Sequence, residues 1–289
     1  MSSKQLNILV TGANGQLGQE LQVLASDFPQ YKFLFTTKEE LDILHPVETA
    51  EYFSDRSIDF CINCAAYTAV DKAEEEKENA FFINAYAVAC IADICHKNKT
   101  QLIHISTDYV FDGTANDPYK ETDSTNPSSV YGKSKMHGEE LALRNDPSAI
   151  IIRTSWLYSA FKNNFVKTML RLMKENESIN VVNDQFGSPT YAADLAAAIM
   201  QIIVSGKSNH NPGIYHYTDA GITTWYEFAL AIKKLTNSNC IVDPIPTSQY
   251  PTAATRPAYS VLDTTKIKKT FGVSVPAWEE SLKKCLALL

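Results

Sequence analysis

Residues 7–18 read Asn7-Ile8-Leu9-Val10-Thr11-Gly12-Ala13-Asn14-Gly15-Gln16-Leu17-Gly18, and this stretch decides the fold of the 289-residue chain. After Asn7, its residues Ile8, Leu9 and Val10 are apolar and partly β-branched, which predicts a strand. The glycines that follow predict a turn, and the segment from Gln19 to Ala25 has the composition of a helix. A strand, a glycine-rich turn and a helix in this order are typical of a nucleotide-binding α/β unit.

Each glycine of this turn has a physical role in such a unit. Gly12 permits the tight turn, Gly15 lets the backbone approach a pyrophosphate, and Gly18 lets the helix pack closely on the strand. Amide groups at the start of the helix then face the phosphates. We therefore expect a dinucleotide cofactor to contact Gly12, Asn14, Gly15, Gln16, Leu17 and Gly18. The spacing is G-x-x-G-x-x-G, and such a turn alone is also compatible with a purely structural role.

Strand and helix patterns alternate along the first two thirds of the chain. Strands are predicted near 7–11, 32–37, 58–64, 101–106 and 149–153. This alternation predicts an α/β fold with a doubly wound parallel sheet, the Rossmann type. Past residue 180 the alternation weakens. We expect residues 1–180 to form the NAD(P)-binding Rossmann domain and residues 181–289 a smaller C-terminal α/β substrate-binding domain, with a helix near 192–205 returning to the first.

A second pattern is Tyr131-x-x-x-Lys135, within a segment from Ser129 to Arg144 that favours a helix. Residues four apart share a helix face, and an ammonium near a phenol lowers the pKa of that phenol from about 10. Thr107 ends the predicted strand 101–106, and open α/β sheets place chemistry at strand carboxyl ends. Thr107, Tyr131 and Lys135 are therefore the predicted catalytic residues. A chance pair on a solvated helix is the alternative, although Tyr158, the only other tyrosine with a lysine four residues on, lacks the upstream hydroxyl.

Together these motifs resemble the extended short-chain dehydrogenase/reductase family. The residues that carry the resemblance are the glycine turn, Asn63-Cys64-Ala65-Ala66, Thr107 and Tyr131-x-x-x-Lys135. Longer motifs resemble the dTDP-4-dehydrorhamnose reductases within it: Ala66-Tyr67-Thr68-Ala69-Val70-Asp71-Lys72-Ala73-Glu74, Ser106-Thr107-Asp108-Tyr109-Val110-Phe111-Asp112-Gly113, Arg153-Thr154-Ser155-Trp156 and Asp184-Gln185-x-Gly187-x-Pro189-Thr190. The resemblance runs nearly end to end. It implies an enzyme of dTDP-rhamnose biosynthesis that transfers hydride to the C4 keto group of a dTDP-sugar, with Tyr131 as proton donor.

The resemblance also implies binding roles for individual residues. Asp42 and Ile43 would contact the adenine, while Ala65, Ala66, Tyr67 and Thr68 would contact the middle of the cofactor, and Lys135 its nicotinamide ribose. Thr107, Asp108 and Trp156 would touch the sugar nucleotide, and Gln185 and Arg256 its thymidine or diphosphate portion. Structural alternatives remain: Asp42 as a turn cap, Thr107 as a strand-end cap, and Trp156 as a core residue.

The end of the second predicted strand bears on the choice of cofactor. An acid there would bind the ribose hydroxyls of NAD, but this strand ends Phe35-Thr36-Thr37-Lys38. Because Lys38 can receive a 2′-phosphate, we expect NADPH, with NADH as the alternative that Glu39 and Glu40 keep open.

Two other kinds of function are alternatives for a chain with these motifs. A sugar-nucleotide 4,6-dehydratase would carry an Asp-Glu pair after Thr107, whereas this chain has Asp108-Tyr109; an epimerase is harder to separate by sequence. The other is a non-catalytic NADP-binding protein, because the regulatory subunit of methionine adenosyltransferase resembles the same reductase family. The intact set of Thr107, Tyr131 and Lys135 favours catalysis.

The composition of the chain excludes some classes of binding partner. The net charge is −7 with scattered Lys and Arg, so no nucleic-acid partner is expected. No apolar run approaches about 18 residues and the start of the chain is polar, so we expect no membrane partner and a cytoplasmic location.

No metal site is predicted from the cysteines or from two acids. Cys61 and Cys64 form a C-x-x-C, but residues three apart on a strand face opposite sides. Some family members resemble metal-linked dimers, and Glu20 and Asp194 would be the corresponding acids. Two acids without ligand spacing do not predict a magnesium site, so we do not predict bound magnesium. A homodimer is still an alternative to a monomer.

Overall fold

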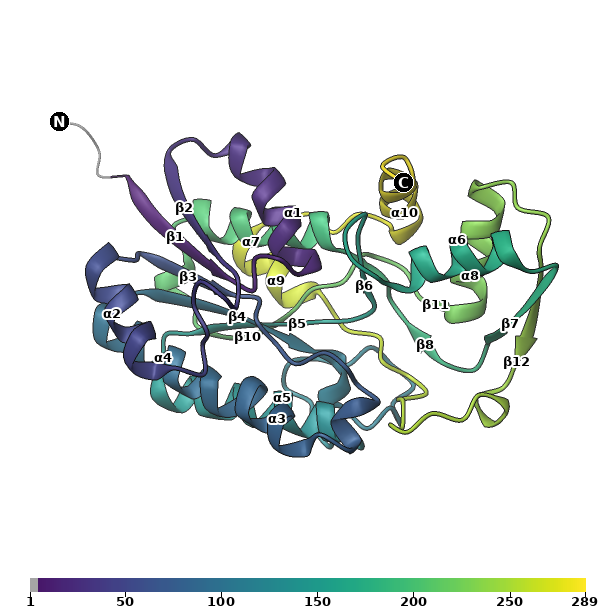
Figure 1. Cartoon of the computed structure of the whole chain (residues 1–289), viewed down its shortest axis with the longest axis horizontal. Helices are drawn as coiled ribbons and strands as arrows, with labels where there is room; N and C mark the ends of the chain where they lie inside the picture. Colours follow the sequence, from purple (N-terminus) through teal and green to yellow (C-terminus); the bar gives the residue numbers. More distant parts are fainter. Residues whose placement is uncertain (1–4) are drawn as a thin grey trace.

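The computed structural model describes residues 5–289, and its centre is a six-stranded sheet in which every strand pairs in parallel (Figure 1). The strand order is β10-β5-β4-β3-β1-β2. Their bounds are β1 (Leu6–Thr11), β2 (Tyr31–Thr36), β3 (Phe60–Asn63), β4 (Gln101–Thr107), β5 (Ile150–Thr154) and β10 (Gly213–His216). The predicted doubly wound α/β fold is confirmed, and five of these strands lie within two residues of the predicted ranges.

Helices cover both faces of the sheet. One apolar cluster joins the sheet to α1 (Gln16–Leu24), α7 (Ala192–Val204) and α9 (Thr265–Phe271). The cluster on the other face includes residues of α2 (Pro46–Arg56), α4 (Ala87–Asn98) and α5 (Val130–Asn145). Cys61 packs in the second cluster and Cys64 against the first, so the two thiols lie on opposite faces, as predicted from their spacing. All six cysteines are free thiols.

The helical run Lys77–Asn98 comprises α3 (Lys77–Phe81), a π-helical turn at Phe82–Tyr86, and α4. By length and composition alone its 22 residues are apolar enough to cross a membrane. However, half of that stretch is buried, and Val88 and Ile91 pack in the cluster beneath the sheet. The run is therefore a core helix of this fold.

The remaining elements build a second lobe with its own apolar cluster, to the right in Figure 1. Its strands are short and pair two by two: β6 (Leu157–Tyr158) with β9 (Thr190–Tyr191), β7 (Ser178–Val182) with β12 (Ile241–Ile245), and β8 (Phe186–Gly187) with β11 (Thr223–Thr224). Its helices are α6 (Phe165–Glu175), α8 (Trp225–Leu235) and α10 (Trp278–Leu286).

Single 3-10 turns occur along the described residues of both lobes, at Ala25–Asp27, Lys72–Glu74, Asp108–Val110, Ser208–His210 and Thr247–Gln249.

The chain crosses between the two lobes more than once. After residue 180 it returns to the main sheet, because α7 packs on α1 and β10 pairs with β5. Strand β10 reads Gly213-Ile214-Tyr215-His216 and lacks the continuous apolar run that indicates a buried strand in the sequence. The division at residue 180 stays a prediction. Residues 181–289 contain α7 and β10, and both of these elements pack with the main sheet.

Candidate active site

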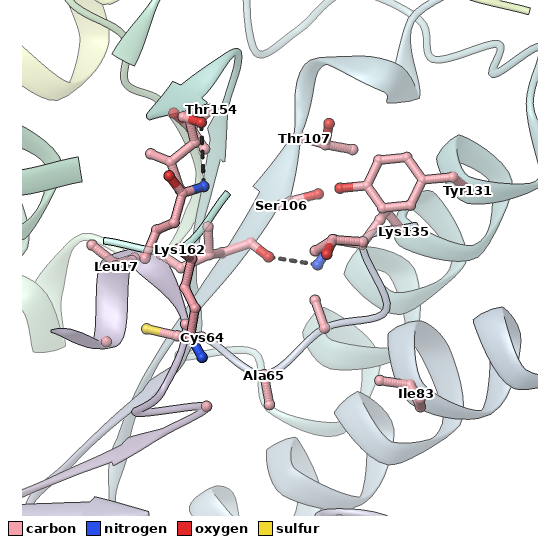
Figure 2. A pocket seen from close by; sticks show the side chains of 18 of the residues that line it. Leu17, Cys64, Ala65, Ile83, Ser106, Thr107, Tyr131, Lys135, Thr154 and Lys162 are labelled. Carbon is pink, nitrogen blue, oxygen red and sulfur yellow. Dashed lines mark hydrogen bonds between the residues drawn. The ribbon is translucent and has the colours of Figure 1, made fainter. Parts of the chain in front are cut away.

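A cavity of about 840 Å³ lies at the carboxyl ends of the central strands, where β1 has β2 on one side and β3 on the other. Such a switch in strand order is where open α/β sheets bind ligands. Most of the predicted site residues line it: Gly12, Asn14, Gly15, Gln16, Leu17, Gly18, Lys38, Asp42, Ile43, Ala65, Ala66, Thr68, Thr107, Asp108, Tyr131, Lys135 and Trp156. Figure 2 shows Thr107, Tyr131 and Lys135 together on one side of this cavity.

The glycine turn has the close approaches that its sequence predicts. Gly12 has φ +65°, and a Cβ there would lie 2.7 Å from the backbone nitrogen of Ala65. A Cβ on Gly18 would lie 2.6 Å from the Cα of Ala13, so only glycine lets α1 pack this closely on the turn. The helix begins at Gln16, three residues earlier than predicted, and Gly15 precedes it without a capping side chain. The first amide groups of α1 thus face the cavity, an arrangement that fits the phosphates of a dinucleotide.

The segment after β2 forms the far end of the cavity. Lys38 is 69% exposed, and its Nζ lies 3.7 Å from Oδ2 of Asp42. Asp42 accepts a hydrogen bond from the amide of Leu44 at 3.0 Å, so it caps a turn as well as lining the cavity. The amide of Thr37 donates to the carboxylate of Glu40 at 2.8 Å. Lys38 lines this end of the cavity, whereas Glu39 and Glu40 do not.

Tyr131 and Lys135 lie one turn apart on α5, whose first turn is capped by the Ser129 hydroxyl. Lys135 is 2% exposed. Its Nζ donates to the carbonyl of Ile105 at 2.6 Å and lies 3.3 Å from Nε2 of His104, both on β4. Figure 2 shows this lysine directed at the β4 backbone while the Tyr131 ring faces Ser106 and Thr107.

The protonation of this pair differs from the sequence-based expectation. Burial raises the pKa of Tyr131 to about 12, although a hydrogen bond with Thr107 opposes the rise. Burial lowers the pKa of Lys135 to about 8, with Glu139 opposing that change. Lys135 is not among the groups that shift the pKa of Tyr131 in the protein by itself, because the lysine amine is held at the β4 backbone. Its predicted effect on Tyr131 in the complex with the cofactor stays a prediction. Tyr131 is a neutral phenol near neutrality, the form that can give up a proton.

Thr107 and Asp108 lie directly at the end of β4. The Thr107 hydroxyl donates to Oδ1 of Asp108 at 3.0 Å and accepts from the amide of Tyr109 at 3.2 Å. It thus caps the 3-10 turn and lines the cavity as well. Asp108 is 1% exposed, and burial raises its pKa to about 6 against hydrogen bonds with Ser260 and Thr107.

Trp156 lies at the entrance to the second lobe rather than in a core. Its ring stacks on Trp225 with centroids 3.5 Å apart and planes 9° from parallel, and both rings line the cavity. A Cβ on Gly187 would lie 2.5 Å from the Trp156 indole, so glycine makes room for the ring. Trp156 has φ +48°, a backbone conformation that few non-glycine residues adopt and one that often marks a functional site.

Three predicted binding residues are outside the cavity lining. Gln185 is buried and donates to the hydroxyl of Thr247 at 3.0 Å. Arg256 forms an ion pair with Asp71 at 2.7 Å. The Tyr67 hydroxyl donates to Glu76 at 2.9 Å. The binding roles of these three residues stay predictions.

Sequence reasoning missed several residues that shape the site. Trp225, Asn164 and Phe165 line the cavity from the second lobe, and Asn164 donates to the Gln16 side chain at 2.9 Å across the two lobes. None belongs to a motif with a readable spacing, because the contacts come from the tertiary fold.

Asn84 is a further residue that the sequence did not indicate. It is fully buried in the π-helical turn, its carbonyl oxygen accepts from the amide of Tyr67, and its amide donates to the Tyr67 carbonyl and to the Ser134 hydroxyl on α5. It thereby ties the loop after β3 to the helix that carries Tyr131 and Lys135. A π-helical turn is frequent at functional sites and was the structural signal for this residue.

The two acids considered for a metal lie near each other. Burial raises the pKa of Glu20 to about 7, and the charge of Asp194 adds to the rise. Across residues 5–289, no three His, Cys, Asp or Glu side chains are arranged to hold a metal ion.

Comparison with known proteins gives consistent matches over the whole chain. The family described as RmlD substrate binding domain matches residues 6–289. A dTDP-4-dehydrorhamnose reductase of Aggregatibacter actinomycetemcomitans is 43% identical over 97% of this chain and 98% of its own length. The crystal structure of such a reductase from Clostridium acetobutylicum aligns with a TM-score of 0.93 at 41% identity, covering 98% of this chain and 99% of that one. A Bacillus anthracis structure in complex with NADP aligns with a TM-score of 0.94 at 38% identity, covering 99% and 100%.

Proposed function

The chain belongs to the RmlD substrate-binding-domain family, and on that basis we propose that it is a dTDP-4-dehydrorhamnose reductase that uses NADPH, or NADH, to reduce the 4-keto group of dTDP-4-dehydro-L-rhamnose to dTDP-L-rhamnose. The observation that carries the proposal is the joint position of Thr107, Tyr131 and Lys135 in the cavity that the glycine turn closes.

Different residues of the chain would bind different parts of the cofactor. The amide groups at the start of α1 would hold the pyrophosphate, Lys38 and Asp42 the adenosine end, and the loop at Ala65–Ala66 the middle. Lys135 would hold the nicotinamide ribose. When bound, the reduced nicotinamide supplies a hydride.

Tyr131 would donate its phenolic proton to the oxygen of the keto group as that oxygen gains negative charge. Its raised pKa keeps it protonated beforehand, which suits the direction of reduction. The Thr107 hydroxyl, whose proton is directed at Asp108 in the protein by itself, would turn to donate its hydrogen bond to the same oxygen. Asp108 and Trp156 would position the sugar nucleotide. After proton transfer, a protonated Lys135 would stabilise the phenolate.

Tyr109 supports reduction rather than dehydration. It follows Asp108, where the resembling dehydratases carry a glutamate, and its ring lies edge-on to Tyr131 with centroids 5.5 Å apart. Burial raises its pKa further above the ordinary value for tyrosine. A neutral phenol there cannot replace a carboxylate as a base.

The location and assembly of the protein are part of the proposal. Six free thiols suit a reducing compartment, which supports a cytoplasmic enzyme. A homodimer also remains part of the proposal.

The substitution Tyr131→Phe tests the catalytic assignment. Removing the proton donor should lower turnover by about 10²–10⁴-fold while NADPH still binds, measured by the fluorescence of the reduced nicotinamide. Tyr158→Phe is the matched control, since Tyr158 also has a lysine four residues on but is buried in the second lobe. Full turnover in Tyr131→Phe would sink the assignment.

A further inference from the structure

His104 stands in a buried chain of hydrogen bonds that ends at Lys135. The imidazole is completely buried on β4, with Nδ1 3.1 Å from Nδ2 of Asn63 and Nε2 3.3 Å from Nζ of Lys135. Asn63 in turn contacts Thr11 at the end of β1. The mechanism above assigns no role to His104 or Asn63.

The orientation of the Asn63 amide is fixed by a backbone donor. The amide N–H of Ala65 donates to Oδ1 of Asn63 at 3.2 Å, and the Thr11 hydroxyl donates to the same oxygen at 2.7 Å. A backbone N–H can only donate, so the atom that faces it must be the carbonyl oxygen of the amide. The NH₂ group of Asn63 must then be the atom that faces His104.

The tautomer of His104 follows from that orientation. The Asn63 NH₂ donates to Nδ1, so Nδ1 carries a lone pair and the single proton of the neutral ring is on Nε2. Burial, with the charge of Lys135 adding to the effect, lowers the pKa of His104 well below its ordinary value, so the ring is neutral. The hydrogen on Nε2 therefore points at the Lys135 amine.

We propose that His104 is a positioning residue for Lys135: Asn63 holds the ring as the Nε2–H tautomer, which presents a proton donor to the lysine amine and disfavours its ammonium form. An ammonium group has three donors and no acceptor, so it cannot accept this hydrogen, whereas a neutral amine can. The hydrogen bonds that link Thr11, Asn63 and His104 would thus set the proton affinity of Lys135.

The other groups around Lys135 act in both directions. Glu139 on the next turn of α5 and Cys64 after β3 favour the ammonium form, as does the Ile105 carbonyl that accepts from Nζ. Tyr131, one turn earlier on α5, is neutral. Burial disfavours the charged form of Lys135, and the Nε2–H donor of His104 disfavours that form as well. Lys135 can then gain and lose its proton near the pH of the cell. This suits a residue next to Tyr131, because the charge of Tyr131 changes in each turnover.

Histidine NMR tests the tautomer in the whole protein without cofactor. In protein labelled with ¹⁵N-histidine, couplings from the ring carbon protons show which nitrogen carries the hydrogen. The His104 signals are identified by their loss in His104→Gln. We expect Nε2–H in the unmodified chain, and Nδ1–H there would overturn the proposal. This measurement needs no variant at Asn63 to fold.

The substitution Asn63→Asp tests the link to Lys135. A carboxylate at this position can only accept, so it should draw the hydrogen to Nδ1 and leave a lone pair on Nε2 for the lysine. The ¹³Cε signal of Lys135, identified by its loss in Lys135→Met, should then titrate about one pH unit higher or more. A switched tautomer with an unmoved lysine titration would refute the coupling. His137→Gln, on the outer face of α5, should change neither signal.

The catalytic consequence rests on the proposed reductase function. The limb of the pH–activity profile that reports Lys135 should move in Asn63→Asp in the same direction as the NMR titration. If the enzyme lacks reductase activity but the tautomer and titration results hold, only the proposed function fails.

Discussion

Arg256 and Asp71 form a two-armed ion pair, with Nη2 2.7 Å from Oδ2 and Nη1 3.1 Å from Oδ1, across 185 residues of sequence. Asp71 follows the loop predicted to hold the middle of the cofactor, and it also accepts from the amide of Ala254 at 3.0 Å. The charge that we expect to bind a diphosphate is thus already engaged by a carboxylate. The hydrogen bond with Arg256 lowers the pKa of Asp71.

Substitutions on the two sides of this pair separate substrate binding from structure. If Arg256 binds the diphosphate, Arg256→Gln should raise the KM for the sugar nucleotide about tenfold or more, because a charge-assisted contact is lost. Asp71→Asn keeps the arginine and should raise KM by less than about threefold. Equal effects of both substitutions in steady-state kinetics would mean that Arg256 acts only through the ion pair.

Gly12 and Gly206 have the same φ of +65°, but only Gly12 is crowded. Alanine at either position should cost about 1–2 kcal/mol of stability from the left-handed backbone. Gly12→Ala should in addition weaken NADPH binding by more than about tenfold, since its Cβ would meet the backbone of residue 65. Calorimetry measures the NADPH affinity of each variant, and urea unfolding measures its stability. Comparable NADPH affinity in the two variants would contradict the assignment of the turn at Gly12 to the cofactor site.

Lys38 should set the preference for NADPH. Lys38→Ala is expected to lower kcat/KM for NADPH about tenfold and leave that for NADH nearly unchanged, because the 2′-phosphate loses a cation. Lys32→Ala, at an exposed position earlier on β2, is the control. An equal fall with both cofactors would place the 2′-phosphate elsewhere.

Asp108 should make the stability of the protein depend on pH. Its folded pKa of about 6 exceeds the ordinary 3.8, so the folded state holds the proton more tightly and loses stability as pH rises from about 4 to about 6. At about 1.36 kcal/mol per pKa unit, the full effect is about 3 kcal/mol above that range. Asp108→Asn should therefore be more stable than the unmodified chain at about pH 8 but not at about pH 4. Urea unfolding at both values checks this, and a difference independent of pH would refute it.

Local sequence patterns were sufficient to predict five of the six strands of the sheet and about half of the residues that line the cavity. The run from Asn7 to Gly18 predicts a strand, turn and helix through contacts between near neighbours. The structure has a tight turn at Gly12, with φ +65°, and close packing at Gly18. Thr107 and Tyr131 come together because β4 ends at the carboxyl edge of the sheet and α5, the next helix after the loop at residues 111–129, packs on β4 and on the turn that follows it.

Features that depend on distant contacts could not be predicted in this way. The stacking of Trp156 on Trp225 and the tie from Asn84 to Tyr67 and Ser134 join segments whose meeting no periodicity specifies. The raised pKa of Tyr131 also escaped prediction, because it depends on how deeply the phenol is buried and on the Lys135 amine pointing at β4.

The most direct test of the reductase assignment is the oxidation of NADPH by the purified protein with freshly prepared dTDP-4-dehydro-L-rhamnose, followed by the absorbance of the reduced nicotinamide. A blank without the sugar and a parallel run with NADH complete the measurement. We predict sugar-dependent oxidation of one NADPH for each dTDP-L-rhamnose formed. Folded protein that binds NADPH yet shows no oxidation above the blank would contradict the account.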